Sequence, residues 1–227
     1  MSIVHYGTAT FGSGGAEPYA RALRRNESPV LFLHEPRSGE LLAAHAMDVA
    51  RWNAEADLVD LSLLASVTGP VLDVGCGPGR MVRAARDLGL ETLGIDVSPT
   101  AIDIATDAGL PVLLGSVFDA VPGEGQWHTA LLADGNIGIG GDVTRMLARC
   151  SELIADAGEI VVEIHPDADH DRIFTGRLVD TQGHESEEFP WAEIGLSAIM
   201  RRASALHLDL RQAWRLDDRD FCRLAKR

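Results

Sequence analysis

The sequence has little cysteine and no long apolar run. Only three cysteines occur in 227 residues, and Cys76, Cys150 and Cys222 lie far apart and form no C-x-x-C pair. This usage argues against a disulfide framework or a cysteine zinc motif, and it predicts a reduced, cytoplasmic setting. No stretch of 18 apolar residues occurs, so we expect no membrane span. The first six residues lack a basic segment followed by an apolar core, so we expect no signal peptide.

Positive charge is also scarce. The chain has 20 Lys and Arg residues against 34 Asp and Glu, a formal net charge of −14. Sequence-independent affinity for nucleic acid comes from Lys and Arg, so this balance argues against a nucleic-acid partner. Residues 201–227 are the exception, with eight Arg and Lys against four Asp. Their charges alternate with apolar residues, which favours a solvated sheet face over a nucleic-acid patch.

What the sequence does have is a glycine-rich turn. Residues 71–79 read Val-Leu-Asp-Val-Gly-Cys-Gly-Pro-Gly, and a helical pattern follows over 81–88. The three glycines let the backbone approach a ligand closely. A strand, a turn and a helix in this order present backbone N–H groups to a nucleotide-like molecule. A dinucleotide fingerprint would need glycine at position 80, where this chain has Arg80.

Strands and helices alternate after this turn. The hydrophobic pattern predicts helices over 98–108 and 142–154, and strands over 71–74, 91–95, 111–114, 127–133 and 159–164. This alternation indicates an α/β fold with a parallel sheet and helices on both faces. The last residues predict an antiparallel hairpin. In its first strand the even-numbered residues over 206–216 are apolar, interrupted only by Gln212. Its second strand covers 221–225.

The D-x-G-x-G-x-G run that begins at Asp73 resembles the cofactor loop of class I S-adenosylmethionine-dependent methyltransferases. The resemblance covers residues 56–165 by motif and 191–227 by pattern. It implies a doubly wound, mostly parallel seven-stranded sheet, into which the C-terminal hairpin inserts an antiparallel strand. It also implies S-adenosyl-L-methionine as the cofactor. The residues it assigns to cofactor binding are Asp73, Gly75, Cys76, Gly77, Gly79, Asp96, Val97, Ser116, Val117 and Asp134.

The resemblance gives the acids and glycines specific roles. Asp73 is expected to orient the loop and to reach toward the methionine amino group. Gly75 and Gly77 are expected to lie under the methionine and ribose portions. Asp96, nineteen residues past Gly77, is expected to accept bonds from both ribose hydroxyls. The alternative role for Asp96 is the N-cap of the helix over 98–108.

The adenine end departs from the family pattern. Ser116 stands where many relatives carry an acid, and it is expected to accept a bond from the adenine amino group. The Val117 backbone is expected to serve the ring. Cys76 lies inside the glycine turn, where we expect a small filler and not a nucleophile.

Two loops at the carboxyl edge supply the catalytic candidates. Residues 134–142 hold four glycines in nine positions, which is typical of a loop that meets a ligand. Asp134 and Asn136 are therefore expected beside the transferred methyl group, and the alternative is a long helix-capping turn. His165 follows the 159–164 strand on the same edge. It is either a general base or an ordinary loop histidine.

The remaining segments lie outside the cofactor pattern. Residues 1–50 are predicted to form a lid or flexible segment, and 51–227 the cofactor-binding methyltransferase domain. An apolar stripe at Leu42, Val49, Ala56 and Leu63 predicts one helix or two shorter ones. Later, the pattern predicts a strand over 172–181, a turn over 182–184 and a helix over 191–204.

Taken with the resemblance, the sequence predicts an enzyme that transfers a methyl group by direct displacement to an O, N, S or C nucleophile. The acceptor is expected to be a small molecule, held under a lid made by residues before 50 and by 167–190. No metal site, nucleic acid or membrane is expected. Two alternatives stay open, a non-catalytic module that binds the methyl donor and a nicotinamide-dependent oxidoreductase on the related fold.

Overall fold

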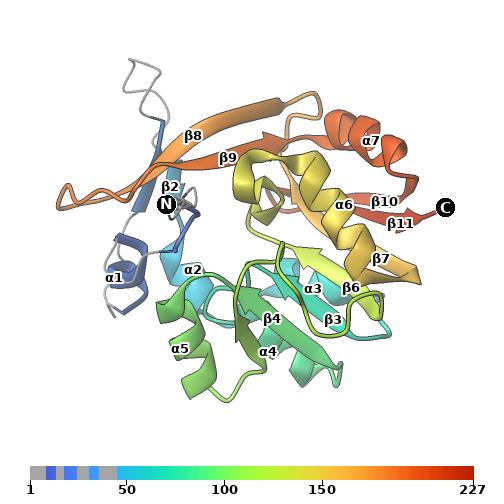
Figure 1. Ribbon diagram of the computed structural model, residues 1–227, viewed down its shortest axis with the longest axis horizontal. Coiled ribbons are helices and arrows are strands. Elements are labelled where there is room, and N and C mark those ends of the chain that lie inside the picture. Colours follow the sequence, from blue (N-terminus) through green and yellow to red (C-terminus); the bar gives the residue numbers. More distant parts are fainter. Residues whose placement is uncertain (1–8, 14–17, 25–30, 36–44) are drawn as a thin grey trace, which may run out of the picture.

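A computed structural model describes residues 9–13, 18–24, 31–35 and 45–227, and these form two sheets (Figure 1). The larger sheet has seven strands in the order β10-β11-β7-β6-β3-β4-β5. They are β3 (Val71–Val74), β4 (Thr92–Asp96), β5 (Val112–Leu114), β6 (Trp127–Leu132), β7 (Ile154–Ile164), β10 (Leu208–Leu216) and β11 (Arg219–Lys226). Strands β3 to β7 pair in parallel, while β11 is antiparallel to β7 and to β10. The predicted fold class is confirmed.

Helices cover both faces of this sheet because the side chains of its strands alternate between the faces. Leu72 and Val74 of β3 pack with helices α6 (Val143–Leu153) and α7 (Leu196–Ala205) on one face. Val71 packs with α3 (Leu58–Leu64) and α4 (Arg80–Asp87) on the other. Helix α5 (Pro99–Asp107) begins after Ser98, whose hydroxyl accepts a bond from the Ala101 N–H.

The smaller sheet is formed by strands from the two segments outside the cofactor pattern, residues before 50 and the region after β7. Its order is β2-β1-β8-β9, all antiparallel. The strands are β1 (Leu31–His34), β2 (His45–Met47), β8 (Asp171–Asp180) and β9 (Phe189–Ile194). Helices α1 (Pro18–Arg24) and α2 (Val49–Asn53) pack beside it through an apolar cluster that includes Tyr19, Leu31, Leu178 and Trp191. In Figure 1 this sheet lies along the top and left of the molecule.

Two predicted elements differ from the structure, and for a third the structure has one of the two predicted alternatives. Residues 191–194 were expected to begin a helix, but they belong to β9, and α7 begins only at Leu196, after the extended Gly195. The pairing of β9 with β8 buries Phe189, Trp191 and Ile194, and this outweighs the local helical pattern. Strand β7 begins at Ile154 instead of 159. The N-terminal stripe breaks between α2 and α3, and its position 42 lies outside the described residues.

The C-terminal hairpin contains a bulge that explains the interrupted parity. Leu210 pairs with Leu224, and Gln212 pairs with the next residue, Arg223, so β10 carries one extra residue at this point. A one-residue shift moves the following side chains to the opposite face. Leu208 and Leu210 accordingly pack with α7, whereas Trp214 stacks on Phe221 on the α3 side, 5.3 Å between ring centroids.

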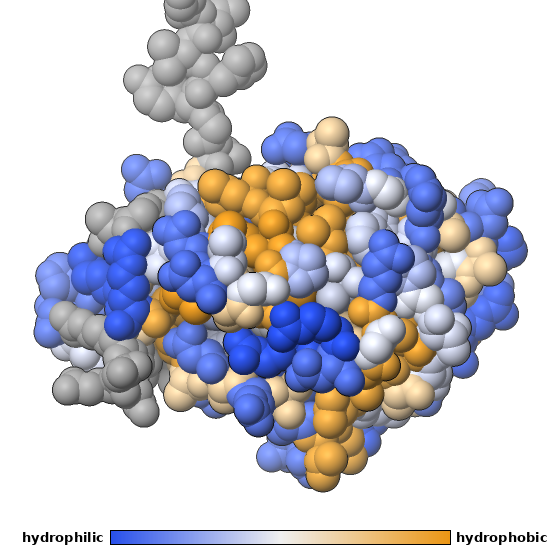
Figure 2. Space-filling view, turned by 90° about the horizontal axis from the view of Figure 1, so that it is seen from below, coloured by the Kyte–Doolittle hydropathy of each residue, from blue (hydrophilic) through white to orange (hydrophobic). Residues whose placement is uncertain are grey.

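Within the described residues, no helix is long and apolar enough to cross a membrane. Figure 2 shows one face of the surface, on which hydrophobic residues gather in a central patch with hydrophilic residues around it.

Candidate functional site

One pocket lies between the carboxyl ends of the parallel strands and the smaller sheet. Its first wall comes from the large sheet and the loops that follow β3, β4, β5 and β6. The residues of that wall include Asp73, Val74, Gly75, Cys76, Gly77, Ile95, Asp96, Val97, Gly115, Ser116, Val117, Asp134 and Asn136. The opposite wall includes Phe11, Tyr19, Met47, Trp52 and Trp191. We call these the glycine-loop wall and the aromatic wall.

The glycine loop needs its glycines for two different reasons. Gly75, Gly77 and Gly79 all have positive φ, at 74°, 54° and 90°. A Cβ on Gly75 would lie 2.7 Å from the amide nitrogen of Asn136, whereas among the described residues a Cβ on Gly77 would meet only the Tyr19 hydroxyl, at 3.4 Å. The space above Gly77 is therefore open for a ligand.

Gly79 does not line the pocket. It starts helix α4 in a left-handed conformation, and a Cβ there would come 2.5 Å from the Leu110 side chain. The predicted cofactor contact of Gly79 is not supported, because this glycine serves the packing of α4 on α5.

Asp96 holds the glycine loop from the neighbouring strand. One carboxylate oxygen accepts the Gly77 N–H and the other the Ser98 N–H, each at 2.8 Å. The N-cap of α5 is Ser98 and not Asp96, so the alternative role of Asp96 does not apply. Burial raises the pKa of Asp96, while these backbone N–H groups oppose the shift. Each oxygen keeps a further lone pair for a hydroxyl donor in the pocket.

Asp73 carries an unsatisfied oxygen. Its carboxyl group is 2% exposed, and the Oδ2 atom has no hydrogen-bond partner among the described residues. Burial raises the pKa of Asp73 to about 7, against the opposing charge of Arg80. A buried carboxylate without a partner is costly, so this atom is suited to a cationic ligand group.

Three further predicted residues line the pocket without making a polar contact into it. The Ser116 hydroxyl accepts the Phe118 N–H at 3.2 Å, which shapes the turn beside Val117. Cys76 packs its sulfur against Val82 and Gly94, and burial raises the pKa of this thiol well above its ordinary value. A buried, protonated thiol is a poor nucleophile, in agreement with the expected filler role.

The sequence did not reveal a buried network of charges beneath the pocket. Arg80 is 5% exposed and donates to both Asp60 and Asp134. Arg219, from the start of β11, donates to Asp60 at 2.8 Å and to both oxygens of Glu163 at 2.6 and 2.7 Å. These groups come from α3, α4, β7 and β11, so no local motif contains them. Two sequence features could have indicated this network of charges: Arg80 inside the glycine motif, and Glu163 at the end of a predicted strand.

Asp134 and Asn136 both line the pocket, as predicted, and both also support it. Asp134 has a φ of 52° and pairs with Arg80 and Arg219. Its pKa is raised by burial despite the opposing charge of Arg80. The Asn136 amide nitrogen donates to the carbonyls of Val74 and Gly75 at 2.9 and 3.0 Å, which ties the loop after β6 to the glycine turn.

His165 lies outside this pocket. It borders a separate hollow with Pro166 and Trp214, and its ring stacks on His170 at 3.8 Å between centroids. Its Nδ1 atom accepts the Asp167 N–H at 3.1 Å. The general-base role predicted for His165 is not supported, because the bend after β7 turns the chain away from the pocket toward β9.

Comparisons with known proteins agree with this geometry. Residues 71–158 match a family described as a methyltransferase domain. No curated protein matches the sequence significantly. The fold is similar to that of a S-adenosylmethionine-dependent methyltransferase from Bacteroides fragilis, solved with S-adenosyl-L-homocysteine, at a TM-score of 0.76 and 18% identity, over 95% of this chain and 94% of that one.

Two further structures are similar over a smaller share. One is the 1,6-didemethyltoxoflavin-N1-methyltransferase of Burkholderia thailandensis, solved with its acceptor and S-adenosylhomocysteine (TM-score 0.58, 18% identity, 78% of this chain and 80% of that one). The other is the CcbJ methyltransferase of Streptomyces caelestis (TM-score 0.57, 16% identity, 74% and 88%). Residues 71–158 thus match a methyltransferase domain, and the chain has the fold of the S-adenosylmethionine-dependent methyltransferase from Bacteroides fragilis.

Proposed function

We propose that this protein binds S-adenosyl-L-methionine against the glycine-loop wall and transfers its methyl group to a small molecule held against the aromatic wall. The observation that carries the proposal is the pocket itself, which has a polar wall suited to the cofactor and an apolar wall facing it. The three similar structures described above are methyltransferases, and the Burkholderia enzyme was solved with both 1,6-didemethyltoxoflavin and S-adenosylhomocysteine.

The residues present fit the cofactor. The unpartnered Oδ2 atom of Asp73 suits the methionine ammonium group, and the Asp96 carboxylate suits the ribose hydroxyls. The open space over Gly77 admits the ligand where a side chain would fill it. Ser116 and Val117 border the place left for adenine. When bound, the cofactor supplies an activated sulfonium methyl group.

The aromatic wall indicates the kind of acceptor. Phe11, Tyr19 and Trp52 contact one another edge to face, with ring centroids 5.1 to 6.2 Å apart, and Trp191 lies 5.5 Å from Phe11. Such a wall binds flat or apolar groups well. Among the described residues that line the pocket, the only Lys or Arg is Arg80, which is already paired with two carboxylates. The acceptor is therefore an uncharged or cationic molecule with an apolar body, and not a phosphate ester.

The protein accelerates the reaction mainly by positioning the acceptor and the cofactor. Holding acceptor and cofactor in line inside a water-poor pocket supplies several kcal/mol, up to about 10 kcal/mol, of the rate enhancement. A base is required only if the acceptor atom must lose a proton. Asp134 and Asn136 remain the candidates for contact with the transferred group, because both line the pocket and Gly135 between them lies beside the Trp191 ring of the aromatic wall.

Calorimetry with S-adenosylhomocysteine and NAD tests the cofactor half. We expect S-adenosylhomocysteine to bind with a Kd of about 10 μM or tighter, which at 1 mM ligand stabilises the fold by about 2.7 kcal/mol. Binding of NAD without binding of S-adenosylhomocysteine would refute the proposal. Binding without turnover across a broad acceptor panel would favour a non-catalytic module.

A pair of tryptophan substitutions tests the acceptor half. Trp52→Leu removes a ring of the aromatic wall, while Trp214→Leu removes one on the far side of β11. Once the panel yields an acceptor, Trp52→Leu should raise its KM about tenfold, since an aromatic contact is worth about 0.5–1.5 kcal/mol. The Kd of S-adenosylhomocysteine should change less than about threefold. Trp214→Leu should leave both constants unchanged. A truncation of residues 1–40 is a weaker test, because it also removes β1 from the edge of β8.

A further inference from the structure

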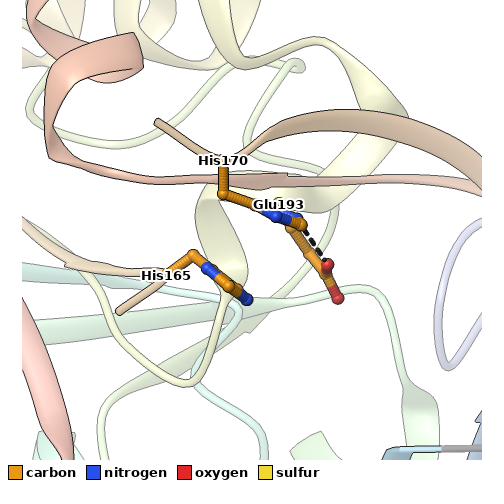
Figure 3. A group of neighbouring side chains, drawn as sticks. All are labelled: His165, His170 and Glu193. Carbon is orange, nitrogen blue, oxygen red and sulfur yellow. Dashed lines mark hydrogen bonds and ion pairs between the residues drawn. The ribbon is translucent and has the colours of Figure 1, made fainter. Parts of the chain in front are cut away.

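Three metal-ligating side chains meet where the two sheets join. His165 follows β7, His170 precedes β8, and Glu193 lies on β9 (Figure 3). Each offers a donor atom, and the three atoms lie within 4.8 Å of one another. The two imidazole rings are stacked with an interplanar angle of 16°, and the His170 Nε2 atom lies 3.0 Å from a Glu193 oxygen. None of the three lines the pocket assigned to cofactor and acceptor.

The backbone around this group is firmly held. The His165 N–H donates to the Ile194 carbonyl, and the Gly195 N–H donates to the His170 carbonyl, both at 2.8 Å. The Ser197 N–H donates to the Ala168 carbonyl at 2.8 Å. The loop between β7 and β8 is thus fixed against the end of β9. The three donors need only side-chain rotation to converge further, so ordering them costs little entropy.

We propose that His165, His170 and Glu193 bind one divalent transition-metal ion, with Zn²⁺ as the reference ion. Two imidazole nitrogens and one carboxylate oxygen form a donor set that suits Zn²⁺ and its neighbours in the first transition row, and does not suit Mg²⁺ or Ca²⁺. The side chains of His170 and Glu193 are 23% and 20% exposed, which leaves a coordination position open to water. At Zn–N distances of about 2.0–2.1 Å, tetrahedral donors lie about 3.3 Å apart, so side-chain rotation must bring together donor atoms that are now as much as 4.8 Å apart.

Coordination changes the hydrogen bonds of both rings. The proton between His170 Nε2 and Glu193 must leave this hydrogen bond so that Nε2 can bind the metal, and the neutral ring then carries its proton on Nδ1. His165 accepts the Asp167 N–H on Nδ1, so in its neutral form the proton is on Nε2, the atom that must bind the metal. Metal binding therefore moves this proton to Nδ1 and breaks the bond to Asp167. The loss of that bond limits the affinity to the micromolar range, and it gives the site a spectroscopic signature.

A bound ion would cross-link the two sheets. The ion would tie the end of β7 in the large sheet to β8 and β9 in the smaller one. Because the smaller sheet carries Trp191 of the aromatic wall, the metal would stiffen the support of that wall without touching a reactant.

Titration of the metal-free protein with Zn²⁺, followed by calorimetry, tests the proposal. We expect one ion per chain with a Kd of about 1–10 μM, and a weakening of at least about tenfold in His170→Ala and in Glu193→Gln. His184→Ala is the matched control, because His184 also pairs with a carboxylate, that of Asp180, but belongs to no cluster of three such ligands among the described residues. This control should bind Zn²⁺ with unchanged affinity. Circular dichroism verifies that each variant is folded, and Glu193→Gln preserves the shape of the side chain.

Two spectroscopic readouts distinguish this site from loose surface binding. Co²⁺ should give visible absorption bands of a four- or five-coordinate ion, and nitrogen NMR of the imidazoles should show the His165 proton moving from Nε2 to Nδ1 as Zn²⁺ is added. Absence of one-to-one Zn²⁺ binding would overturn the proposal. Equal affinity in the wild-type protein and the two ligand variants would overturn it as well, because the ion would then lie elsewhere.

Discussion

The two walls of the pocket are built in opposite ways. The glycine-loop wall draws its polar contacts from a short stretch, in which the N–H groups of Gly75 and Cys76 bond to the Ile95 carbonyl and Gly77 bonds to Asp96. The aromatic wall draws its rings from distant parts of the chain, such as Phe11 and Trp191. One wall is fixed by backbone hydrogen bonds, and the other by side-chain packing.

This difference separates what the two walls can recognise. Backbone groups and a carboxylate at fixed positions suit a single ligand with many polar atoms. A wall of packed aromatic rings accepts many flat molecules of similar size. The glycine-loop wall thus favours one fixed cofactor, and the aromatic wall favours a range of acceptors. Each of the following changes tests one of the two walls.

The largest effect is expected at Asp60, which supports the glycine-loop wall from beneath. It is 1% exposed and pairs with Arg51, Arg80 and Arg219. In Asp60→Asn the buried Arg80 loses one of its two carboxylates, and we expect the free energy of unfolding to fall by about 3–5 kcal/mol. Urea denaturation measures this change.

Asp57→Asn is the control for Asp60. Asp57 caps the same helix but is half exposed, and asparagine caps about as well as aspartate, so the loss should stay below about 0.5 kcal/mol. Equal losses in the two variants would mean that the charge network contributes little to stability.

Asp96→Ala should give the next largest effect, on cofactor affinity. The loss of charge-assisted bonds to the ribose hydroxyls should weaken S-adenosylhomocysteine by about 1.5–3 kcal/mol. Stability should also fall, because the Gly77 and Ser98 N–H groups lose their acceptor. Calorimetry on the folded fraction separates the two effects, with Asp103→Ala on the exposed face of α5 as the control. Unchanged affinity per folded molecule would restrict Asp96 to a structural role.

The same contrast explains what the sequence could predict. Asp73, Gly75, Gly77 and Asp96 belong to one strand–turn–helix–strand run, so the family resemblance that this run carries could assign them to cofactor binding. The alternation of strands and helices and the C-terminal hairpin followed from hydrophobic periods, whereas the seven-stranded sheet was implied by the resemblance. The parity break at Gln212 was visible, and only the pairing of Leu210 with Leu224 identified it as a bulge.

Long-range contacts account for what could not be predicted. Strand β9 pairs with β8 across a turn, and the local sequence of 191–194 favours a helix until Trp191 and Ile194 are buried. Arg219 is an unremarkable turn residue in the sequence, and it gains its role only when β11 brings it beside Glu163. His165 lies at the expected sheet edge, but the direction of the next loop decides which hollow it borders.

A smaller effect per pH unit is expected through Asp73. Burial raises its pKa from 3.8 to about 7 in the folded protein, while Arg80 opposes the shift and the nearby acids Asp134, Asp96 and Asp60 add to it. The unfolded chain loses this proton near pH 4 and the folded chain near pH 7, so stability decreases as pH rises through this window, by up to about 1.4 kcal/mol per unit. Asp73→Asn, which does not titrate, should lack this component.

The ligand should reverse this trend. If the cofactor ammonium group pairs with the Asp73 carboxylate, binding releases a proton below pH 7, and affinity for S-adenosylhomocysteine should rise up to about tenfold per unit between pH 6 and 7. Calorimetry in buffers of different ionisation enthalpy measures the proton. A wild-type affinity that does not vary with pH would place the ammonium group elsewhere.

The smallest effect is expected at Cys76, the one side chain of the glycine turn that packs inward. Its sulfur fills the space left by Gly94 beside Val82, and its protonated thiol makes no bond into the pocket. Cys76→Ala removes one buried atom, so we expect a loss of about 1 kcal/mol in stability and less than about a twofold change in the Kd of S-adenosylhomocysteine. Cys150→Ala, in the core under α6, should show a similar loss of stability and no change in affinity. A loss of turnover in Cys76→Ala, with cofactor affinity intact, would instead make this thiol part of the chemistry, and the glycine-loop wall would then do more than hold the methyl donor.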